Sequence, residues 1–466
     1  MNAHEGLTWH VAEWVARQQE EPLPPGLHRH ARRMVLDHLA GVVASSVGPV
    51  SHAVATHVAR TYPGDAATAV GHGRSSILGA AVLNGTNGHG IEADEGYTPG
   101  SMHPTSVVLP AVFAVAEQTG AGPERVLKAA VTGMELACRI AAAGHPATRN
   151  RHFHNTPLGG VFGAAAAVAA LNGGSVAEVA NALGIAGSHA GGLFAFLNGS
   201  AEVKRLHPGK AARDGIVSAD LAAAGLTGPT TVLEGPEGYF AAFAGEPGVD
   251  WFPGRITDGL GAEWVLENTY VKPYPCCRHL HGAIDAAIAL REEHRFAPEA
   301  VTAVRVGTFA IAANHNGTVL DTVLDAQLSL PFTVAVALRR GAVTLTDFAE
   351  DQRFDAENRK LMETVAVEVD DAANAAYPRS GRPAEVTVTL ADGASVRHRV
   401  EQPYGEPSNP VSDSALEDKV RALCEPVIGE KETARLIQAV WAFENLDFLA
   451  CADAAVRSGS GRSRGE

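Results

Sequence analysis

The chain has 466 residues, of which 46% are hydrophobic and 19% are charged, so it has room for two or three domains and is too apolar to be disordered. Its 37 basic and 52 acidic residues give a net charge of −15, which argues against nucleic acid as a partner because phosphate binding needs a basic surface. The same charge implies that an anionic substrate must be held by a local cluster of cations.

Cysteine usage and hydropathy bear on the compartment. Five cysteines, two of them adjacent, give no disulfide framework and indicate reducing conditions. The first 14 residues lack the basic start and apolar core of a signal peptide. Apolar runs such as residues 161–171 are shorter than the ~20 residues that span a bilayer. We therefore expect a cytoplasmic protein with no membrane partner.

Helical periodicity dominates the first half of the chain. The pattern predicts helices over residues 7–18, 25–45, 54–61, 75–84, 110–119, 122–143, 158–171, 175–184 and 211–224. Ser75 is expected to be the N-cap of the helix that begins there. Up to about residue 245 no stretch alternates with period 2, so this part is predicted to be all-helical.

The pattern changes after Trp251. It predicts a helix over residues 281–294, strands over 301–311, 365–369, 385–390 and 395–400, and final helices over 416–424 and 430–443. Asp392-Gly393 is a strong hairpin signal between the last two strands. The predicted organisation is mainly α with an α+β second domain: a helical domain of residues 1–270 completed by 405–456, a smaller α/β domain of residues 271–404, and a disordered tail of residues 457–466.

Titratable groups are concentrated in the stretch from His89 to Pro110. This Gly- and Pro-containing segment carries imidazole, carboxylate and hydroxyl groups on His89, Glu92, Asp94, Glu95, Tyr97 and His103, and an apolar helix follows it. Loops carried on rigid helices are common positions for catalytic groups. The alternative is a solvated acidic loop with a capping Ser or Thr.

Two more stretches carry candidate groups. Residues 202–210 contain Lys204, Arg205, His207 and Lys210 in front of the helix predicted at residue 211. The N–H groups at that helix start would add to an anion site, although a surface basic patch is the alternative. His152 and His154 precede the helix at 158, so His154 and His103 could point into one cleft between helices.

Metal and cofactor motifs are missing from the sequence. His-x-His occurs at His152/His154 and, beside Cys276-Cys277, at His279/His281, but neither CxxC nor HExxH is present, and adjacent cysteines are poor chelators. There is no GxGxxG after a predicted strand, no GxxxxGK[ST] and, before the polar C-terminal tail, no GxSxG. We therefore predict acid–base and electrostatic chemistry with no metal and no organic cofactor.

Several long stretches, including HGIEADEGYTPGSMHPTSVVLPA, HNTPLGGVFGAAAAVAALNG, EVKRLHPGKAARDGIVSADLAAAGL and KPYPCCRHLHGAIDA, occur in the order of a known family. The chain resembles the MmgE/PrpD family, which includes 2-methylcitrate dehydratase, cis-aconitate decarboxylase and iminodisuccinate epimerase. The resemblance extends from about residue 10 to 455. It implies a large helical domain built from both chain ends, a smaller inserted α/β domain, a homodimer, and no need for a cofactor or metal.

The resemblance also implies site residues. Asp94, His103, His154 and Lys204 fall on the family's active-site positions, and Lys272 and Arg278 lie in its KPYP-C-R motif. Together with these last two, we take Tyr97 and His207 as candidate substrate-binding residues. This sequence departs from the family at two places that bear on the substrate: Gly96-Tyr97 replaces a Thr-His pair, and Phe332 replaces a Tyr.

The expected activity follows from these residues and from the family. Lys204 would hold a carboxylate substrate, His103 or His154 would transfer protons, and Asp94 would orient an imidazole or act as the base. We expect a cofactor-independent lyase, in the first place a hydratase/dehydratase of a hydroxylated di- or tricarboxylate similar to 2-methylcitrate dehydratase. The alternatives are a decarboxylase, an epimerase or other isomerase, and a non-catalytic small-molecule binder.

Overall fold

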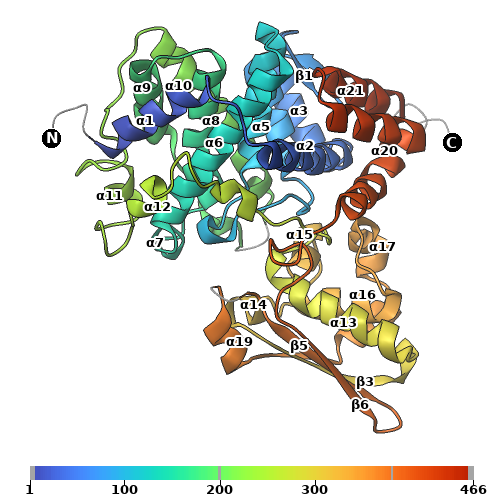
Figure 1. The fold of residues 1–466 in the computed structure, drawn as a ribbon. Helices are drawn as coiled ribbons and strands as arrows, with labels where there is room; N and C mark the ends of the chain where they lie inside the picture. Colours follow the sequence, from blue (N-terminus) through green and yellow to red (C-terminus); the bar gives the residue numbers. More distant parts are fainter. Residues whose placement is uncertain (1–5, 198–200, 379–380, 460–466) are drawn as a thin grey trace. The chain divides into compact units, whose positions relative to one another are not determined.

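A computed structural model describes residues 6–197, 201–378 and 381–459, which form two compact units (Figure 1). The first unit contains the residues up to Gly90, then Asp94–Thr269, and the chain from Ser412 onward. The second unit contains Tyr270–Val411 together with Ile91–Ala93. The predicted fold class is confirmed: both chain ends build a large helical part, and a smaller α/β part is inserted between them.

The elements of the first unit are mainly α-helices, with three short 3₁₀ turns (η). They are α1 (Leu7–Gln18), α2 (Pro25–Ser45), α3 (Pro49–Thr61), β1 (Ala67–Ala69), β2 (Gly73–Ser75), α4 (Ile77–Gly88), η1 (Thr98–Gly100), α5 (Thr105–Thr119), α6 (Pro123–Gly144), α7 (Ala147–Asn150), α8 (Asn155–Leu171), α9 (Val176–His189), η2 (Phe194–Leu197), α10 (Val203–Ala223), α11 (Tyr239–Phe243), α12 (Gly254–Thr257), η3 (Val265–Asn268), α20 (Asp413–Ala442) and α21 (Asp447–Gly459).

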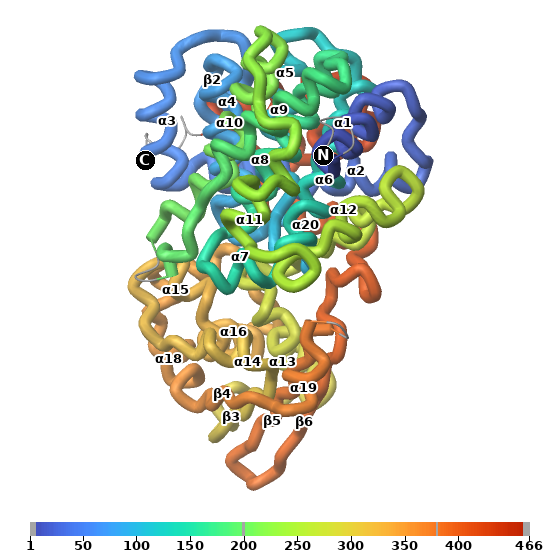
Figure 2. Tube along the Cα trace, turned by 90° about the vertical axis from the view of Figure 1, so that its left-hand side faces the viewer, coloured from blue at the N-terminus to red at the C-terminus, as the bar shows by residue number. Residues whose placement is uncertain are grey.

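Helix α8 lies at the centre of the first unit, and every one of its residues is buried. It packs against α5, α6, α9 and α10, which surround it in Figure 2. Glycine permits the closest of these approaches. A Cβ atom on Gly133 of α6 would lie 2.4 Å from the carbonyl oxygen of Gly163 on α8, and a Cβ on Gly163 would lie 2.4 Å from the carbonyl oxygen of Gly133. The two backbones are therefore in direct contact.

A two-stranded antiparallel hairpin, β1–β2, adds to the helices of this unit and was not predicted. Its strands have three residues each, too few for a period-2 pattern to be visible. The turn depends on Gly71 and Gly73, whose φ angles of 86° and 84° are in the left-handed region. Ser75 belongs to β2, so its predicted role as N-cap is wrong. The cap of α4 is the next residue, Ser76, whose side chain accepts the Gly79 N–H.

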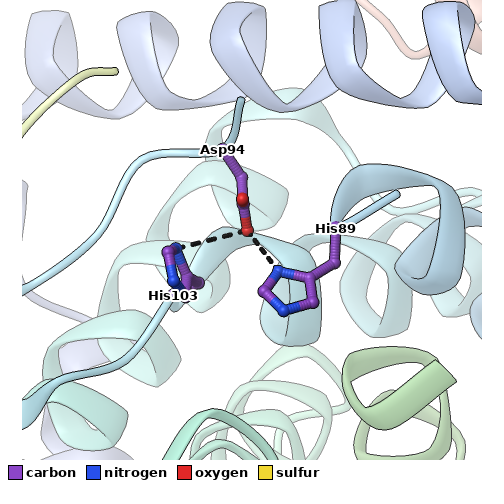
Figure 3. Close-up of side chains that lie close together, drawn as sticks. All are labelled: His89, Asp94 and His103. Carbon is purple, nitrogen blue, oxygen red and sulfur yellow. Dashed lines mark hydrogen bonds and ion pairs between the residues drawn. The ribbon is translucent and has the colours of Figure 1, made fainter. Parts of the chain in front are cut away.

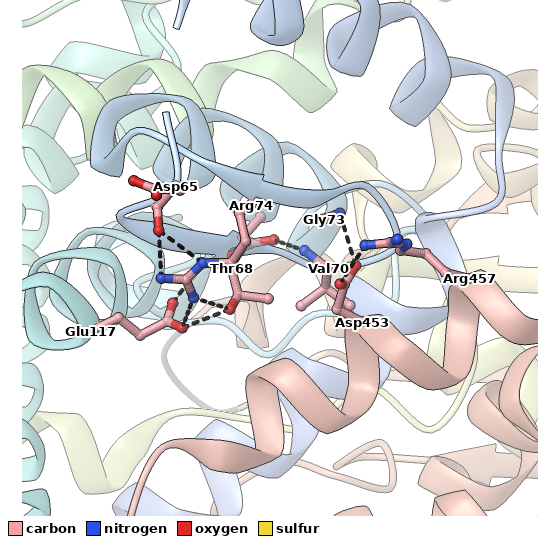
Figure 4. A network of polar contacts seen from close by, with 9 residues as sticks. Asp65, Thr68, Val70, Gly73, Arg74, Glu117, Asp453 and Arg457 are labelled. Atoms are coloured by element: carbon pink, nitrogen blue, oxygen red, sulfur yellow. Dashed lines mark hydrogen bonds and ion pairs between the residues drawn. The ribbon is translucent and has the colours of Figure 1, made fainter. Parts of the chain in front are cut away.

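The hairpin is bound to the C-terminal helix α21 (Figure 4). Asp453 accepts hydrogen bonds from the N–H groups of Gly71 and Gly73 at 3.0 and 2.9 Å. On the other side, Arg74 donates to Glu117 of α5 at 2.9 Å. Helix α21 is thus fixed to the first third of the chain.

The last helices agree with the predicted pair. Helical hydrogen bonding continues through α20, but Gly429 has non-helical angles of φ 80° and ψ 161°, so a kink separates two helical halves. Of the tail that was predicted to be disordered, residues 457–459 are the last residues of α21. Residues 460–466 lie outside the described residues.

The second unit is built on a four-stranded sheet of order β4-β3-β5-β6. Its elements are η4 (Arg278–Leu280), α13 (His281–His294), η5 (Pro298–Ala300), β3 (Val301–Thr308), α14 (Ala310–Ala313), α15 (Val323–Gln327), α16 (Leu330–Arg340), η6 (Leu345–Phe348), α17 (Glu350–Arg353), α18 (Ala356–Met362), β4 (Val365–Val369), α19 (Asp371–Ala376), β5 (Ala384–Leu390) and β6 (Ser395–Val400).

Strand β3 pairs parallel to β4 and antiparallel to β5, and β5 pairs antiparallel to β6. The predicted Asp392-Gly393 turn joins the last two strands, with Gly393 at φ 86°. Alternate residues of β5, such as Val386 and Val388, are buried. Helices α13 and α16 pack against the strands and supply the rest of the hydrophobic core.

A helix that spans a bilayer has to be both long and apolar. In the part of the chain that the structure describes, no single helix is long and apolar enough to cross a membrane. Helices α2 and α3 reach the length and apolar composition of a membrane span only when they are taken together, and the chain bends by 89° between them. Residues 34–45 of α2 are all buried in the first unit.

The contact between α6 and α8 generates a stability prediction. Gly133→Ala and Gly163→Ala should each lower the free energy of unfolding by about 1–3 kcal/mol, because the added methyl group meets a backbone carbonyl that cannot move aside. Urea denaturation measures this change. Gly122→Ala is the control, since nothing lies within 4 Å of a Cβ at that position. If the Gly133 and Gly163 variants are no less stable than the control, the helices do not approach this closely.

Candidate active site

The carboxylate of Asp94 lies between two imidazole rings (Figure 3). Its Oδ2 atom is 2.6 Å from His89 Nδ1 and 3.3 Å from His103 Nδ1. The side chains of Asp94 and His89 are completely buried, whereas 14% of the His103 side chain is exposed. His103 is therefore the ring of this group that a ligand can reach.

The neighbours of the ring nitrogens indicate the tautomers. His103 Nδ1 also makes a short contact with the backbone carbonyl of Glu95. A carbonyl and a carboxylate both accept, so Nδ1 carries the hydrogen and the lone pair of a neutral ring is on Nε2. The same argument gives His89 a protonated Nδ1, and its Nε2 atom has no hydrogen-bond partner among the described residues.

The loop brings Asp94 and His103 together by folding back on itself. Tyr97 and Met102 pair through both backbone hydrogen bonds, at 2.8 and 3.3 Å, around the η1 turn. The carboxylate of Glu95 accepts the backbone N–H of Thr105 at 2.9 Å and also its hydroxyl, which fixes the loop to the start of α5. Burial and the charge of Asp94 raise the pKa of Glu95 to about 8.

His154 and His207 form a second imidazole pair, with their Nδ1 atoms 2.9 Å apart. One nitrogen must donate and the other accept, which suits two neutral rings. Burial, followed by the neighbouring imidazoles and Lys204, holds the pKa of His154 well below its usual range. Burial likewise lowers the pKa of His207 to about 4. The His89 and His154 rings lie 5.8 Å apart between centroids, so the two pairs form one cluster.

Backbone pairing and aromatic rings hold His154 in place. The His154 N–H donates to the Gly192 carbonyl, and the Phe194 N–H donates to the His152 carbonyl, both at 2.9 Å. The rings of Phe194 and Phe196 lie 5.1 and 5.6 Å from the His154 ring between centroids. These two phenylalanines were not among the candidate residues, because no motif marks them. His152, in contrast, is exposed and does not share the position of His154.

Lys204 and His207 lie on helix α10, which begins at Val203 rather than at the predicted residue 211. The expectation that these side chains precede the helix is therefore wrong. Pro208 lies inside the helix, where it removes its own bond to the carbonyl four residues earlier and crowds that carbonyl. Tight packing compensates, since a Cβ on Gly209 would lie 2.1 Å from a carbonyl of α4. A spacing of three residues puts Lys204 and His207 on one face of the helix.

The ammonium group of Lys204 is close to the second imidazole pair. Its side chain is largely buried, and Nζ lies 5.9 Å from the centre of the Phe196 ring. Its positive charge contributes to the lowered pKa values of both His154 and His207. Four of the residues predicted to be catalytic or substrate-binding therefore lie in one cluster with Asp94. His89 connects the two imidazole pairs of this cluster, whose predicted members are His103, His154, Lys204 and His207.

Tyr97 is oriented differently from the other candidates. It is buried, and burial raises its pKa, with further contributions from Cys138 and Glu135 of α6. The charged groups that act on its hydroxyl are Glu135, Arg139 and Arg255. Its side chain therefore faces α6 and α12 residues and not the imidazoles.

Lys272 and Arg278 belong to the second unit, where both are buried. Lys272 Nζ donates to the Glu92 carbonyl at 3.1 Å and lies 3.6 Å from the Glu92 carboxylate. Arg278 binds Glu406 at 3.0 Å and the Tyr404 carbonyl at 2.9 Å. The guanidinium group is thus engaged in the internal structure of this unit.

Phe332, which stands where the family has a Tyr, is also in the second unit. It is fully buried and lies 6.0 Å from the ring of Phe348, inside the hydrophobic core. The apolar replacement is compatible with this surrounding, because a Tyr hydroxyl would need a partner there.

Comparison with known proteins agrees with this architecture. Residues 10–251 match the MmgE/PrpD N-terminal domain, and residues 274–445 match the MmgE/PrpD C-terminal domain. The chain belongs to the MmgE/PrpD family. As an enzyme, it is a lyase of the MmgE/PrpD type.

Relatives of known name cover nearly the whole chain. The cis-aconitate decarboxylase-like protein oryM of Aspergillus oryzae is 28% identical over 94% of this chain and 94% of its own length. Cis-aconitate decarboxylase of Homo sapiens is 28% identical over 90% of this chain and 88% of its own. Cis-aconitate decarboxylase of Aspergillus terreus is 27% identical over 96% and 94%.

The cluster can also be tested as a metal site. Among the described residues, His89, Asp94 and His103 offer ligand atoms that all lie within 4.8 Å of one another. A metal needs a lone pair from each nitrogen. Both Nδ1 atoms instead face acceptors as hydrogen-bond donors, so the group fits an Asp–His hydrogen-bonded pair better than a metal centre.

This donor set generates a prediction. Activity should survive treatment with EDTA, and the purified protein should contain no stoichiometric transition metal, because the histidine nitrogens beside Asp94 carry hydrogens. Elemental analysis by mass spectrometry and assays before and after chelation measure this. About one ion per chain, together with loss of activity on chelation, would contradict the prediction.

The second unit contains a thiol, that of Cys277, whose pKa is lowered. Cys277 Sγ lies 3.7 Å from His315 Nε2. Burial by itself would raise the pKa of the Cys277 thiol, but His315 and the His279 N–H lower it to about 7. Burial raises the pKa of its neighbour Cys276. Only the thiolate reacts with electrophiles, and a free cysteine ordinarily ionises near ~8.5.

We therefore predict that iodoacetamide alkylates Cys277 with a pH midpoint near ~7, and that His315→Gln moves this midpoint upward. Peptide mass spectrometry gives the rate at each cysteine. Cys451 on α21, which is exposed, is the internal control. Equal rates at Cys277 and Cys451 from pH 6 to 9 would show that His315 does not activate the thiol.

Proposed function

We propose that this chain is a cofactor-independent lyase that acts by acid–base chemistry next to a carboxylate of a di- or tricarboxylate substrate. The observation that carries the proposal is the buried Asp94 carboxylate at the Nδ1 side of a partly exposed His103 ring. This arrangement leaves a basic Nε2 atom toward a ligand. Lys204 supplies positive charge for an anion in a protein whose net charge is −15.

The first candidate reaction is dehydration of a hydroxylated acid. His103 Nε2 takes the proton from the carbon next to the carboxylate, and Lys204 stabilises the enolate-like charge that develops. The electron pair then forms the carbon–carbon double bond while the carbon–oxygen bond breaks. The departing hydroxide takes the proton that His103 Nε2 has just accepted, so that water leaves and the His103 ring is neutral again. Burial keeps His154 and His207 neutral, which leaves the His103 imidazolium as the acid of this reaction.

Decarboxylation is the second candidate, favoured by the names of the relatives. In that reaction the bond between carbon and carboxylate breaks, carbon dioxide leaves, and the carbanion takes a proton from an imidazolium. His103, held by Asp94, can carry that proton, and Lys204 again stabilises the negative charge. One proton-transferring ring is sufficient. An epimerase would use the same groups to remove and return a proton on opposite faces.

A substrate screen distinguishes these reactions. The protein is incubated in D₂O with 2-methylcitrate, citrate, cis-aconitate or iminodisuccinate, and each mixture is followed by NMR and by measurement of released carbon dioxide. Loss of water identifies a dehydratase, release of carbon dioxide a decarboxylase, and deuterium exchange without net change an epimerase. Unchanged spectra and no deuterium incorporation in all four mixtures would contradict the proposal for these substrates and favour a binder.

Substitutions in the cluster should separate proton transfer from binding. His103→Asn should lower kcat by roughly 10²–10⁴-fold, the usual contribution of a positioned acid or base. Lys204→Met should raise KM by about 10-fold or more, since it removes a charge-assisted contact. Asp94→Asn should cost less than His103→Asn if Asp94 only orients the ring.

His152→Asn is the matched control for these variants. It removes a neighbouring imidazole that is exposed, and Asn tolerates the left-handed φ of 67° at this position. Steady-state kinetics on the substrate found in the screen give kcat and KM for each protein. Wild-type turnover in His103→Asn would show that the proton is transferred elsewhere.

A further inference from the structure

The chain leaves the first unit and returns to it within a few residues just before Asp94. Gly90 and Asp94 belong to the first unit, whereas Ile91–Ala93 belong to the second. These three residues make contacts of their own inside the second unit, and Asp94 follows them directly in the chain. The contacts of residues 91 and 92 therefore bear on how the chain enters Asp94.

The side-chain amide of Gln327, the last residue of α15, binds two backbone carbonyls. Its Nε2 atom lies 2.8 Å from the carbonyl oxygen of Ile91 and 2.9 Å from that of Pro275. An amide nitrogen carries two hydrogens and can donate to both, whereas an amide oxygen can only accept, so these partners fix the orientation of the amide. Gln327 is completely buried, and its backbone carbonyl accepts the Cys277 N–H at 2.9 Å. Gln327 thus holds residue 91 to the segment 275–277.

Lys272 holds the next residue of the loop. Its Nζ atom donates to the Glu92 carbonyl at 3.1 Å and lies 3.6 Å from the Glu92 carboxylate. Both side chains are almost completely buried, with 2% and 3% accessible. Hydrogen bonds in such surroundings are stronger than they would be in water, so the position of the Glu92 backbone is well determined.

Glu92 has a backbone conformation that a residue of its kind rarely adopts. Its φ angle of 57° lies in the left-handed region, where Cβ crowds the neighbouring backbone and which Gly, Asn and Asp enter most easily. Such conformations persist only where the surrounding structure holds them, and they cluster at functional sites. The bonds of Gln327 to Ile91 and of Lys272 to Glu92 are contacts of this kind. Only Ala93 separates the strained residue from Asp94.

We propose that Gln327 and Lys272 position Asp94 by holding residues 91 and 92 in this conformation. A change of chain direction at Glu92 would displace the Asp94 carboxylate, whose Oδ2 atom lies 2.6 and 3.3 Å from the two imidazole Nδ1 atoms. The inference rests on the proposed acid–base function of the Asp94–His103 pair. Gln327 and Lys272 are positioning residues, because they act through the loop and not on a ligand. This role for Lys272 differs from the substrate binding predicted from the sequence.

Gln327→Met tests the clamp, because methionine has nearly the same shape as glutamine and no hydrogen to donate. Gln352→Met is the matched control, since Gln352 lies in the same unit and its side-chain hydrogen bonds are exposed. Histidine side chains labelled with ¹⁵N report the Nδ1–H groups of His89 and His103 by NMR without any substrate. We expect these resonances to shift or broaden in Gln327→Met and to stay in place in Gln352→Met. Unchanged His103 resonances in Gln327→Met would overturn the proposal.

A second pair of variants tests the conformation of Glu92 and decides the question if Gln327→Met does not fold. Glu92→Asn and Glu92→Thr introduce side chains of nearly the same volume, and both remove the carboxylate beside Lys272. They differ in backbone preference, because Asn tolerates the left-handed region and the β-branched Thr does not. Glu92→Thr should therefore shift the His103 resonances further from their wild-type positions than Glu92→Asn. Equal shifts in the two variants would contradict the proposal.

Turnover gives a readout that separates positioning from general stability. On a substrate that the enzyme converts, Gln327→Met should lose roughly 10–100-fold in kcat relative to Gln352→Met, with KM changed less, because a displacement of about 1 Å at a catalytic group can cost 10²-fold. The loss should disappear in an Asp94→Asn background, where the positioned carboxylate is already missing. A purely structural clamp would lower the melting temperature without this split between kcat and KM. Shifted His103 resonances with wild-type kcat would support the positioning and contradict the proposed function of the Asp94–His103 pair.

Discussion

A carboxylate can remain charged inside a protein only if hydrogen-bond donors replace the water that it has lost, and Asp94 meets this condition with two imidazole Nδ1 atoms. Because those Nδ1 atoms carry hydrogens, Nε2 is the basic atom of each ring. The position of His103 in the cluster therefore depends on the charge of Asp94. Partial exposure of His103, beside a His89 ring that is completely buried, decides which of the two rings a ligand can meet.

Hydrogen bonds that involve the backbone hold the loop around Asp94. Glu95 contributes its carbonyl and its carboxylate to two different partners: the His103 ring and the start of α5. The second imidazole pair has a different environment. Aromatic rings and burial keep His154 and His207 neutral, while Lys204 lies on the same helix face as His207. The cluster thus has the buried carboxylate of Asp94 beside the first imidazole pair and the ammonium group of Lys204 beside the second.

Much of this arrangement could be predicted from residue patterns, for reasons that are local. Helical periodicity gives the bounds of α1, α2 and α13, and Asp392-Gly393 gives the hairpin. Asp94 and His103 lie in one loop, so their proximity follows from short chain separation. The start of α10 was missed because Pro208-Gly209 resembles a helix end, whereas packing on α4 keeps the helix intact. Sequence patterns also cannot assign Phe196, whose contact with the His154 ring comes from a distant segment. His89 lies in the same loop, five residues before Asp94, and this short separation was the signal that could have predicted their contact.

The central claim is that Asp94 fixes the Nδ1–H tautomer of His103 and leaves Nε2 as the atom that handles the proton. The most direct measurement is the ¹⁵N chemical shift of both ring nitrogens of His103 near pH 7, assigned by comparison with His103→Asn. The account predicts a protonated Nδ1 and a lone pair on Nε2, with the preference reduced in Asp94→Asn. A neutral His103 ring with its hydrogen on Nε2 in the wild-type protein would contradict it.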